Sequence, residues 1–420
     1  MKPLHIAIAG YGSAGQAASL LLARDGHRVE VFERVAHPGP VGAGFLLQPT
    51  GMGVLLELGL LDAALQLGAP VRRLFGDLPN GRRIMDMRYS ELQPQLFGLG
   101  MQRTALFQLL HAARSEATQL QFAAEVQSVD AEHGRLHTAD GRQHGPYDLV
   151  IAADGSGSQL RAALGPHRLD RPYPWGALWC LLPAEGWPHG AELRQRYQGA
   201  RRMIGLLPVG GCGANPRPHL SFFWSLPCAE FERWRSGDMD AWRSELYALW
   251  PEATEVLMRL PAEASGLARA SYRDTVLRRW HTGRLCAIGD AAHAMSPQLG
   301  QGVNMALLDA LALRDALRAE SRVDAALRRY AAERRAHVGI YHLWSRWLTP
   351  LFQSDHRLLA RLRDALFLPL SRMPGSRGQS LAVLSGTQQG LFGRRRIPAS
   401  LLQALADHRS HAKPSARDRA

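Results

Sequence analysis

Lysine is almost absent from this sequence of 420 residues, where it occurs only as Lys2 and Lys413. Arginine therefore carries nearly all of the positive charge, and the formal net charge is +13 at pH 7. The arginines are spread along the chain, and many stand in helix-like stretches such as 314–318, where a solvated helix face explains them. The densest cluster, 394–396, is too short to indicate a nucleic-acid surface. The excess of positive charge still favours anionic partners, such as a dinucleotide cofactor or an acidic carrier protein, over DNA or RNA.

Cysteine is scarce as well, and the four that occur are scattered: Cys180, Cys212, Cys228 and Cys286. They match neither a CxxC motif nor a zinc-ligand spacing, so we interpret them as buried thiols in a reducing cytoplasm. No run of about eighteen uncharged apolar residues occurs, which excludes a membrane-spanning helix of ordinary length. The N-terminus enters a strand-like run at once, without the basic and apolar regions of a signal peptide. We therefore expect a cytoplasmic protein.

Several kinds of catalytic centre are also missing from the sequence. It shows no paired carboxylates, no cluster of metal ligands and no serine triad. His408 and His411 have a spacing that could suit a metal ion, but they stand in a polar tail, and we interpret that spacing as coincidence. We therefore expect no metal site.

A glycine-rich turn near the start of the chain predicts a dinucleotide site. An apolar strand, a GxGxxG, an Ala- and Leu-rich helix and a second strand follow one another over residues 5–9, 10–15, 16–24 and 28–33. Gly10 makes the tight turn, Gly12 lets backbone reach a pyrophosphate, and Gly15 allows the helix to pack closely on the strand. The helix N-terminus then faces the phosphates.

The second strand ends in Glu33, 18 residues beyond Gly15. A carboxylate at this position is placed to bind a ribose hydroxyl. It would repel a 2′-phosphate. The ligand is therefore expected to be FAD or NAD rather than NADP.

Two further strand-to-glycine turns occur downstream. A buried strand over 148–153 leads into Asp154-Gly155-Ser156-Gly157-Ser158, with Arg161 on a helix start. The stretch GRLCAIGDAAHAMSPQLGQGVNMALLDA, residues 283–310, runs from a strand through Gly289–Asp290 and a Gly-Gln-Gly into a long apolar helix. Three such turns imply a ligand long enough to reach all of them, which favours FAD over NAD.

In order and spacing these motifs resemble those of the class A flavoprotein monooxygenases, the family of p-hydroxybenzoate hydroxylase. The resemblance covers roughly residues 4–345 and rests on the GxGxxG, the DG motif at Asp154–Gly155 and the GD motif at Gly289–Asp290. Residues 101–106 also resemble the arginine-containing helix start of that family. The resemblance implies an α/β fold with a Rossmann-like FAD-binding domain of the p-hydroxybenzoate hydroxylase type, an antiparallel β-sheet substrate domain and C-terminal helices. It further implies FAD as cofactor and NAD(P)H as a transiently bound co-substrate.

The same resemblance implies roles for single residues. The glycines of the first motif hold the pyrophosphate, and Glu33 holds the adenosine ribose. Arg103 lies along the ribityl–diphosphate part, Asp154 supports the cofactor in a motif that is also associated with NAD(P)H use, and Asp290 accepts a hydrogen bond from a ribityl hydroxyl. The full set of expected cofactor-binding residues is Gly10, Gly12, Ser13, Ala14, Gly15, Glu33, Arg34, Gly44, Arg103, Val126, Asp154, Gly155, Gly289, Asp290, Pro297, Gly300, Gln301, Gly302, Val303 and Asn304.

The resemblance places Pro297 and the loop 300–304 beside the isoalloxazine ring. Amide N–H groups at the following helix N-terminus would there stabilise negative charge on the reduced flavin. Pro297 and His293 are the candidate catalytic residues. His293 could contact flavin or substrate, or it could fix the turn by hydrogen bonding, and the sequence leaves both open. Gly44, in a glycine turn over 42–49, would allow close approach of the ring.

Between about residues 166 and 275 the composition changes: short runs rich in aromatic residues and leucine alternate with Gly and Pro. This pattern predicts antiparallel strands. The family has its substrate sheet here, so one face of the sheet would line an apolar, aromatic pocket. The pattern does not say which face. The expected domains are an FAD-binding domain over 1–75, 101–165 and 276–340, a substrate-binding sheet domain over 76–100 and 166–275, and a C-terminal helical segment over 341–420.

The C-terminal segment contains a stretch, 357–370, with apolar residues at helical spacing and arginines between them. Such a helix could pack on the FAD-binding domain, shield the pocket or lie on a membrane surface. Core packing is the preferred interpretation. From about His408 the chain is polar and expected to be disordered.

By this resemblance the chain is expected to be an NAD(P)H- and O₂-dependent monooxygenase. It would hydroxylate or epoxidise an aromatic or polyketide-like small molecule through a flavin C4a-hydroperoxide. Two alternatives stay open: an FAD-dependent reductase of a prenyl or other apolar substrate, and a non-catalytic FAD-binding escort protein. A flavin-dependent halogenase is disfavoured because lysine is missing between the termini and Trp175 and Trp179 do not form a WxWxIP motif.

We expect an apolar or aromatic substrate, no nucleic acid and no transmembrane segment. Peripheral membrane contact stays open, and no oligomeric state is predicted.

Overall fold

The first apolar run of the chain forms the strand β1 (His5–Ala9), which is buried from its second residue on. A central strand of a parallel sheet is covered by helices on both faces, so a continuous apolar run is what its position requires. The computed structural model describes residues 1–39, 42–213 and 216–411. In it β1 lies inside a six-stranded sheet of order β18-β19-β12-β1-β2-β8. The other members are β2 (Arg28–Phe32), β8 (Gln119–Gln121), β12 (Leu149–Ala152), β18 (His281–Thr282) and β19 (Leu285–Ala287), and only the β18–β19 pair is antiparallel.

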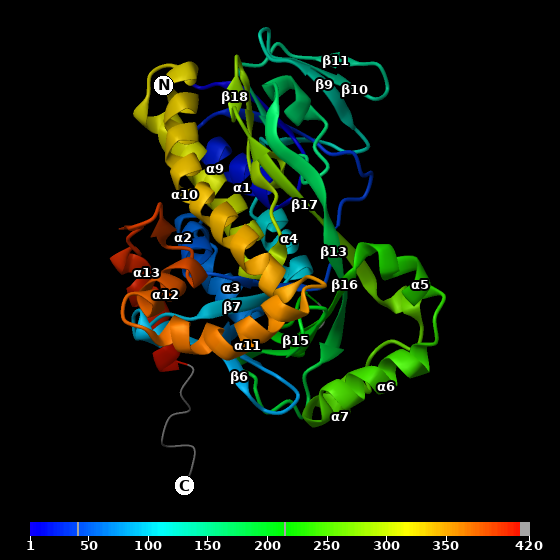
Figure 1. Cartoon of the computed structure of the whole chain (residues 1–420). Coiled ribbons are helices and arrows are strands. Elements are labelled where there is room, and N and C mark those ends of the chain that lie inside the picture. The colour runs from blue at the N-terminus through cyan, green and yellow to red at the C-terminus, as the bar shows by residue number, and fades with distance from the viewer. Residues whose placement is uncertain (40–41, 214–215, 412–420) are drawn as a thin grey trace.

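Three long helices pack side by side against this sheet (Figure 1). They are α1 (Ser13–Arg24), α9 (Gly302–Ala319) and α10 (Val323–Phe352). Buried alanines such as Ala17 and Ala18 on α1, and Ala310 on α9, let the helix axes approach closely. The helix α4 (Arg103–Ala112) packs on α1 as well.

Two small sheets flank the six-stranded one. A hairpin sheet consists of β9 (Val126–Asp130), β10 (Arg135–Thr138) and β11 (Gln143–His144). The second, of order β3-β7-β4, packs on the substrate sheet described next and on α4. Its strands are β3 (Gly44–Leu47), β4 (Ala69–Val71) and β7 (Gly98–Gln102), with the helices α2 (Pro49–Glu57) and α3 (Leu61–Leu67) between β3 and β4.

The predicted substrate sheet is present as seven strands of order β17-β13-β16-β15-β14-β5-β6. Its strands are β5 (Arg73–Asp77), β6 (Arg83–Arg88), β13 (His167–Pro183), β14 (Glu192–Gln198), β15 (Arg202–Val209), β16 (His219–Pro227) and β17 (Ala268–Leu277). The segment 76–100 contributes to this sheet as predicted, but β5 already begins at Arg73, and β5 pairs with β14 in parallel whereas the other pairs are antiparallel. The division into domains stays a prediction, with sheet limits that extend to Arg73 and Leu277.

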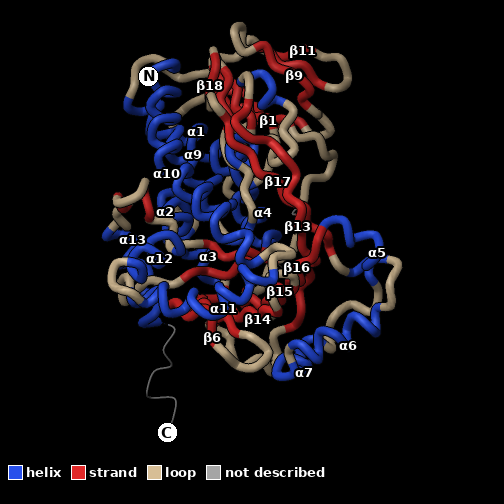
Figure 2. Tube along the Cα trace, viewed as in Figure 1, coloured by secondary structure: helices blue, strands red, loops and turns tan. Residues whose placement is uncertain are grey.

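The two faces of this sheet have different neighbours (Figure 2). The face that carries Phe222 and Trp224 is covered by α5 (Phe231–Arg235), α6 (Met239–Leu249) and α7 (Thr254–Leu257), and forms a core of its own. The opposite face carries Phe223 and packs with Phe352 at the end of α10. The sequence left the choice of parity open, and the structure puts the odd-numbered positions of β16 on the side of α10.

The C-terminal segment continues through α11 (Arg357–Arg372), α12 (Ser376–Leu384), β20 (Gln388–Gln389), β21 (Gly393–Arg394) and α13 (Ala399–His411). Leu381 of α12 and Leu401 and Leu405 of α13 belong to the main apolar core. The core packing preferred for 357–370 is wrong for most leucines of α11, because Leu358, Leu362, Leu366 and Leu370 are exposed, and only Ala360 and Arg363 of that helix are buried. The disorder predicted from His408 is wrong for 408–411, which continue α13, and residues 412–420 lie outside the described residues. Among the described helices, none combines the length and the apolarity needed to cross a bilayer.

Candidate functional site

Three glycine turns meet at the carboxyl ends of the neighbouring parallel strands β19, β12 and β1. Gly10, with φ of +104°, lies so close to the second turn that a Cβ on it would be 2.3 Å from the carbonyl oxygen of Ala153. A Cβ on Gly289, with φ of +59°, would be 2.9 Å from the Cβ of Ala14. Turns that are far apart in the sequence therefore form one continuous surface, at the edge of the sheet where doubly wound folds bind ligands.

The other two glycines of the first turn differ in what surrounds them. A Cβ on Gly15 would lie 2.0 Å from the carbonyl oxygen of Gly10, so α1 can approach the turn only with glycine there. A Cβ on Gly12 would meet no atom within 4 Å, and Gly12 has φ of −74°, which any residue adopts. Gly12 therefore faces open space in the cavity described below, where backbone can approach a ligand.

Glu33, at the end of β2, is held by backbone amides. The amide of Tyr11 donates to its Oε2 at 2.8 Å, and the amide of Val35 donates to its Oε1 at 3.0 Å. These bonds fix the carboxylate beside the first turn, where it lines the cavity. The geometry agrees with the predicted position near a ribose.

Asp154 follows β12 in the second turn. Its Oδ2 accepts from the amide of Gln159 at 3.1 Å, whereas its Oδ1 is buried and has no hydrogen-bond partner among the described residues. Burial raises the pKa of Asp154, and this rise is offset in part by hydrogen bonds from the Ser158 side chain and the Leu160 amide and by the charge of Arg161. A buried acceptor without a partner costs free energy unless a ligand satisfies it, so Oδ1 is a candidate ligand contact.

Arg161 stabilises the conformation of the second turn through hydrogen bonds to its backbone carbonyl groups. Its buried guanidinium donates to the carbonyl oxygen of Gly155 at 3.1 Å and to that of Ser156. It also donates to Thr275 Oγ1 at 2.6 Å and pairs with Asp170 at 3.2 Å, both on the substrate sheet. The second turn is thus tied to the sheet that covers the site.

The third turn is built on a buried carboxylate, that of Asp309 on α9. Its Oδ2 accepts from the amide of Gly289 at 2.7 Å and from Nε2 of His293 at 2.5 Å. Its Oδ1 accepts from Nε of Arg334 on α10 at 2.6 Å. His293 ends the short helix α8 (Asp290–His293), is 2% exposed and packs on the ring of Trp280. Of the two roles left open for His293, fixation of the turn agrees with these bonds.

The same network continues to the C-terminal segment. Arg334 donates through a terminal nitrogen to Nδ1 of His337, and Nε2 of His337 donates to the carbonyl oxygen of Gly386 at 2.9 Å. Burial, with the nearby charge of Arg334, lowers the pKa of His337 to about 3. His337 is therefore neutral at physiological pH, as its two bonds require.

The loop before α9 is anchored through its polar side chains. Gln301 donates to the carbonyl oxygens of Val383 and Leu384, at 3.2 and 2.8 Å. Oδ1 of Asn304 accepts from the amide of Gln48 at 2.8 Å. These side chains hold the loop to its neighbours, so the groups left for a ligand are backbone amides. Gly300 and Gly302 are exposed, and a Cβ on Gly302 would lie 4.0 Å from Oδ1 of the exposed Asp290.

Arg103 begins α4 directly beside the glycine turn over 42–49. A Cβ on Gly42 would lie 3.1 Å from Cδ and Nε of Arg103. Glycine at this position therefore avoids a close contact with the Arg103 side chain. Glycine is required at position 44 for a different reason, because a Cβ there would lie 2.7 Å from Cγ1 of Val209 and 2.8 Å from Cβ of Ser221. Packing of β3 on the substrate sheet already requires glycine at this position, and the expected proximity of a flavin ring stays a prediction.

A cavity of about 630 Å³ opens along the first two turns, a size usual for a small-molecule site. Ten of the predicted cofactor-binding residues line it: Gly10, Gly12, Ser13, Glu33, Arg34, Arg103, Val126, Asp154, Gly155 and Val303. Sequence reasoning missed other lining residues, among them Tyr11, Phe45, Phe107, Glu125, Gly157 and Gln159. Tyr11, Gly157 and Gln159 stand within or directly after the motifs, which could have identified them, whereas no local signal marks the rest.

The remaining predicted site residues do not line this cavity: Ala14, Gly15, Gly44, Gly289, Asp290, His293, Pro297, Gly300, Gln301, Gly302 and Asn304. Ala14, Gly15 and Gly289 support the turns through the contacts given above. The others continue from Val303 along the third turn, and their contacts with a cofactor stay predictions. Among the residues described here, no group of three or more His, Cys, Asp or Glu side chains could hold a metal ion.

An aromatic group from the substrate sheet lies near the start of α4. Trp179 stacks at 5.1 Å from Phe223, and its Nε1 donates to the hydroxyl oxygen of Tyr272 at 3.2 Å. Burial raises the pKa of Tyr272 to about 12, with an opposing effect from the charge of Arg103. The aromatic side of the sheet and the arginine at the cavity are therefore close enough to interact electrostatically.

These features fit a long dinucleotide such as FAD. Open space at Gly12, the amide-fixed carboxylate of Glu33 and the unpartnered Oδ1 of Asp154 lie on one cavity. The exposed loop at Gly300 and Gly302 extends this surface toward the substrate sheet. A ligand that contacted only the first turn would not explain why the second and third turns lie beside it.

Comparisons with known proteins agree with this geometry. A family model described as "FAD binding domain" matches residues 4–340. Kynurenine 3-monooxygenase of Salinispora arenicola is 29% identical over 362 residues, which cover 80% of this chain and 77% of that protein. A 2-heptyl-3-hydroxy-4(1H)-quinolone synthase of Pseudomonas aeruginosa is 28% identical over 321 residues, covering 74% and 80%. The solved structure of Klebsiella pneumoniae HpxO in complex with FAD and uric acid superimposes with a TM-score of 0.76 at 24% identity, over 93% of this chain and 98% of that one.

Proposed function

Since the chain belongs to the FAD binding domain family, we propose that it is an FAD- and NAD(P)H-dependent monooxygenase of an aromatic small molecule. The observation that carries this proposal is the meeting of three glycine turns in one continuous surface, of which the first two line the cavity, next to an aromatic face of the substrate sheet. Of the relatives named above, one is by its name a monooxygenase of kynurenine, and another is a synthase of a hydroxylated quinolone. A non-catalytic escort protein would not need the hydrogen-bond network of the buried Asp309, which holds the third turn in its conformation.

The first two turns would hold the adenosine and diphosphate parts of FAD. The amides at Gly12 and Ser13, at the N-terminus of α1, would bind the pyrophosphate, since helix N-termini attract anions. Glu33 would accept from a ribose hydroxyl, and Arg103 would neutralise a phosphate. Arg34 and Val126 would enclose the adenine end. Asp154 would accept a hydrogen bond through Oδ1.

The third turn would hold the reactive end of the cofactor. Asp290 would accept from a ribityl hydroxyl, and the amides that follow Gly300 would point at the pyrimidine edge of the ring. Because the side chains of Gln301 and Asn304 are occupied elsewhere, these backbone amides and the dipole of α9 would supply the positive field. Pro297 would close one side of the ring site.

Bound FAD supplies electron transfer and oxygen activation: two electrons from NAD(P)H reduce O₂, one oxygen atom enters the substrate and the other leaves as water. The chain's own residues would bind and orient the ring, keep water out and place the substrate. We propose that the substrate is held by the sheet face that carries Trp179, Phe223 and Tyr272. His293 is proposed as a positioning residue that keeps Gly289 and Asp309 in place.

We also propose that the protein works in the cytoplasm. All four cysteines are free thiols, which agrees with a reducing compartment. Cys180 and Cys286 are buried as expected, whereas Cys212 and Cys228 are partly exposed.

The proposal is tested by aerobic turnover under ¹⁸O₂. Purified protein loaded with FAD is mixed with NADH or NADPH and with hydroxylated or aminated aromatic acids and quinolones. The expected result is faster NAD(P)H oxidation with at least one compound and a product heavier by one ¹⁸O atom. A reduced product without label would instead identify an FAD-dependent reductase, and protein that binds no FAD would remove the proposal altogether.

A further inference from the structure

The helix α11 has an apolar side that nothing in the described structure covers. Leu358, Leu362, Leu366 and Leu370, here called the leucine stripe, stand at intervals of one helical turn and are 69%, 45%, 48% and 52% exposed. Residues four apart lie on the same side of a helix. Soluble proteins rarely expose a contiguous apolar patch of this kind without a partner for it.

The orientation of α11 is fixed by a buried residue on an adjoining side of the helix. Arg363 is buried and donates to the carbonyl oxygen of Leu351 at 3.1 Å and to that of Gly199 at 3.0 Å. Its guanidinium also lies over the rings of Tyr197 and Phe352, 5.2 and 5.1 Å from their centroids. A buried arginine cannot exchange places with the leucines, so the stripe stays outside.

Positive charge surrounds the stripe. Arg357 and Arg361 are exposed, each next to a leucine of the stripe, and neither side chain has an ion-pair or hydrogen-bond partner among the described residues. The nearby carboxylates are already paired, Asp364 with Arg363 and Asp355 with Arg201. The long apolar stems of arginines suit the boundary between an apolar and an aqueous phase.

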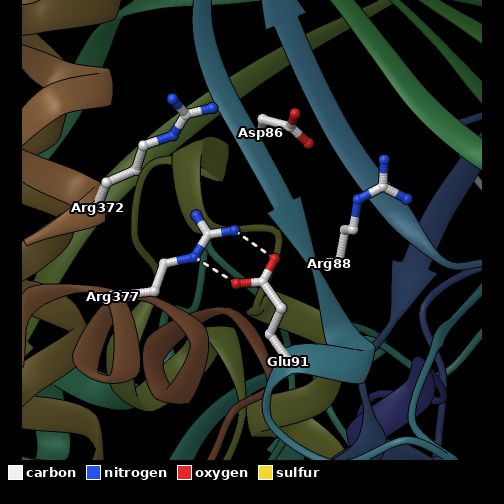
Figure 3. A pocket seen from close by; sticks show the side chains of 5 residues that line it. All are labelled: Asp86, Arg88, Glu91, Arg372 and Arg377. Atoms are coloured by element: carbon white, nitrogen blue, oxygen red, sulfur yellow. Dashed lines mark hydrogen bonds and ion pairs between the residues drawn. The ribbon is translucent and has the colours of Figure 1, made fainter. Parts of the chain in front are cut away.

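A basic pocket of about 350 Å³ lies at the C-terminal end of the stripe and is lined by Asp86, Arg88, Glu91, Arg372 and Arg377 (Figure 3). Figure 3 shows Arg377 engaged with Glu91, to which it donates at 2.7 and 2.5 Å. The remaining nitrogen of Arg377, NH1, is buried and has no hydrogen-bond partner within the described structure.

The other acid of this pocket is also occupied. Asp86 accepts from two nitrogens of Arg73, Nε and Nη2, at 2.7 and 2.8 Å. Arg88 and Arg372 have no ion pair within the described residues, so the basic pocket keeps uncompensated positive charge. Guanidinium groups that converge on one space are the usual partners of phosphate oxygens.

We propose that the outer side of α11 docks on the surface of an anionic lipid bilayer, with the leucine stripe in the apolar boundary and the basic pocket on the phosphate of a lipid headgroup. An amphipathic helix with leucines on one side and arginines beside them binds membranes in this way. A second copy of the chain suits the surface less well. Two stripes in contact would bring the arginines of both copies together with no free carboxylate to pair with them.

The test is flotation of the FAD-loaded full chain with vesicles of phosphatidylcholine alone and of phosphatidylcholine mixed with phosphatidylglycerol. We expect the wild-type protein to float with the mixed vesicles and much less with phosphatidylcholine alone. The variant Arg88→Gln/Arg372→Gln should weaken binding to the anionic vesicles by about fivefold for each arginine. The variant Leu362→Ser/Leu366→Ser should weaken binding by about tenfold for each leucine.

Two matched controls carry the same chemical changes elsewhere. Arg135→Gln/Arg233→Gln removes two exposed arginines on β10 and α5, and Met258→Ser removes an exposed apolar side chain that is 67% exposed. Both controls should float like the wild type. Flavin absorbance and thermal unfolding check that every variant is folded.

Four results would overturn the proposal. The wild type could stay in the bottom fraction with both kinds of vesicle, or the controls could lose binding as strongly as the test variants. Light scattering could show a dimer that the leucine variant converts to a monomer without any change in flotation, which would assign the stripe to contact between copies. Binding of inorganic phosphate that needs Arg88 and Arg372, without flotation, would assign the basic pocket to a free anion.

Discussion

The carboxylate of Asp309 accepts from the amide of Gly289 at 2.7 Å, and this single bond joins the α9 helix to the turn that precedes it. Asp309 is completely buried, as is its ion-pair partner Arg334 on α10. Burial alone would raise the pKa of Asp309, but the charges of His293 and Arg334 outweigh it and lower the pKa to about 2. The backbone of the third turn is therefore shaped by a charged network behind it.

Replacement of Asp309 by Ala should destabilise the protein by about 3–5 kcal/mol, because it leaves Arg334 buried without a counter-charge. Asp309→Asn should be less severe, since the amide oxygen still accepts from Gly289. Urea unfolding of the apoprotein measures both. Asp315→Ala, on the same helix but half exposed, is the control and should cost under about 1 kcal/mol. Equal losses at 309 and 315 would contradict the role of Asp309.

The neutral His337 makes stability depend on pH. Its pKa is lowered from 6.5 to about 3 in the folded protein, so between these values the unfolded chain binds the additional proton. The contribution is fully present above about pH 6.5 and is lost as the pH falls toward 3. His337→Gln keeps a donor for Gly386 and should flatten the change of unfolding free energy over this window. The exposed His356→Gln should leave the slope as in the wild type, and an unaltered slope in His337→Gln would refute the assignment.

Gly12 and Gly15 are three residues apart but should respond in opposite ways to alanine. A Cβ on Gly12 meets open space at an ordinary backbone angle, so Gly12→Ala should change stability of the apoprotein by less than about 0.5 kcal/mol. It should still weaken FAD binding tenfold or more, because the methyl group occupies the space for the pyrophosphate. Gly15→Ala should lose about 3 kcal/mol or fail to fold, since its Cβ would collide with Gly10.

Thermal unfolding of apoprotein and fluorescence titration with FAD separate these two effects. If Gly12→Ala bound FAD as tightly as the wild type, the cofactor would not approach the first turn at Gly12.

Glu33 is expected to contribute to FAD affinity through its charge. Glu33→Gln keeps an acceptor for the Tyr11 amide but loses a charged hydrogen bond to ribose, which is worth about 1.5–3 kcal/mol. Isothermal titration of the apoprotein with FAD should thus show binding weakened by roughly tenfold or more. Glu116→Gln, at an exposed site away from the cavity, should titrate like the wild type. Equal affinity in the Glu33 variant would mean that Glu33 only supports the turn through Tyr11 and Val35.

Most of the correct predictions from the sequence came from short local motifs. A GxGxxG between a strand and a helix, and glycine turns after two further buried strands, depend on short-range backbone requirements, and the structure has all three. The strands of the substrate region were also predictable from their aromatic, Gly-interrupted runs. Their parity was not, because which side of Phe222 and Phe223 is covered depends on α5–α7 and α10 together.

Long-range contacts explain what the sequence did not predict. Gly44 stands in what looks like a ligand loop, yet Val209 and Ser221, far along the chain, leave no room for a side chain there. The network from Asp309 to His337 joins three segments by charged side chains whose spacing shows no motif. The end of α13 is polar and was expected to be disordered, but Leu401 and Leu405 anchor that helix in the core.

Rapid mixing of the anaerobically reduced, FAD-loaded protein with O₂ tests the proposed monooxygenase activity most directly. We predict that a transient near-ultraviolet absorbance, different from reduced and from oxidised FAD, precedes the return of the oxidised spectrum, and that an aromatic substrate shortens its life. Return of oxidised FAD in a single step, with hydrogen peroxide formed in equal amount whether or not aromatic compounds are present, would contradict a monooxygenase.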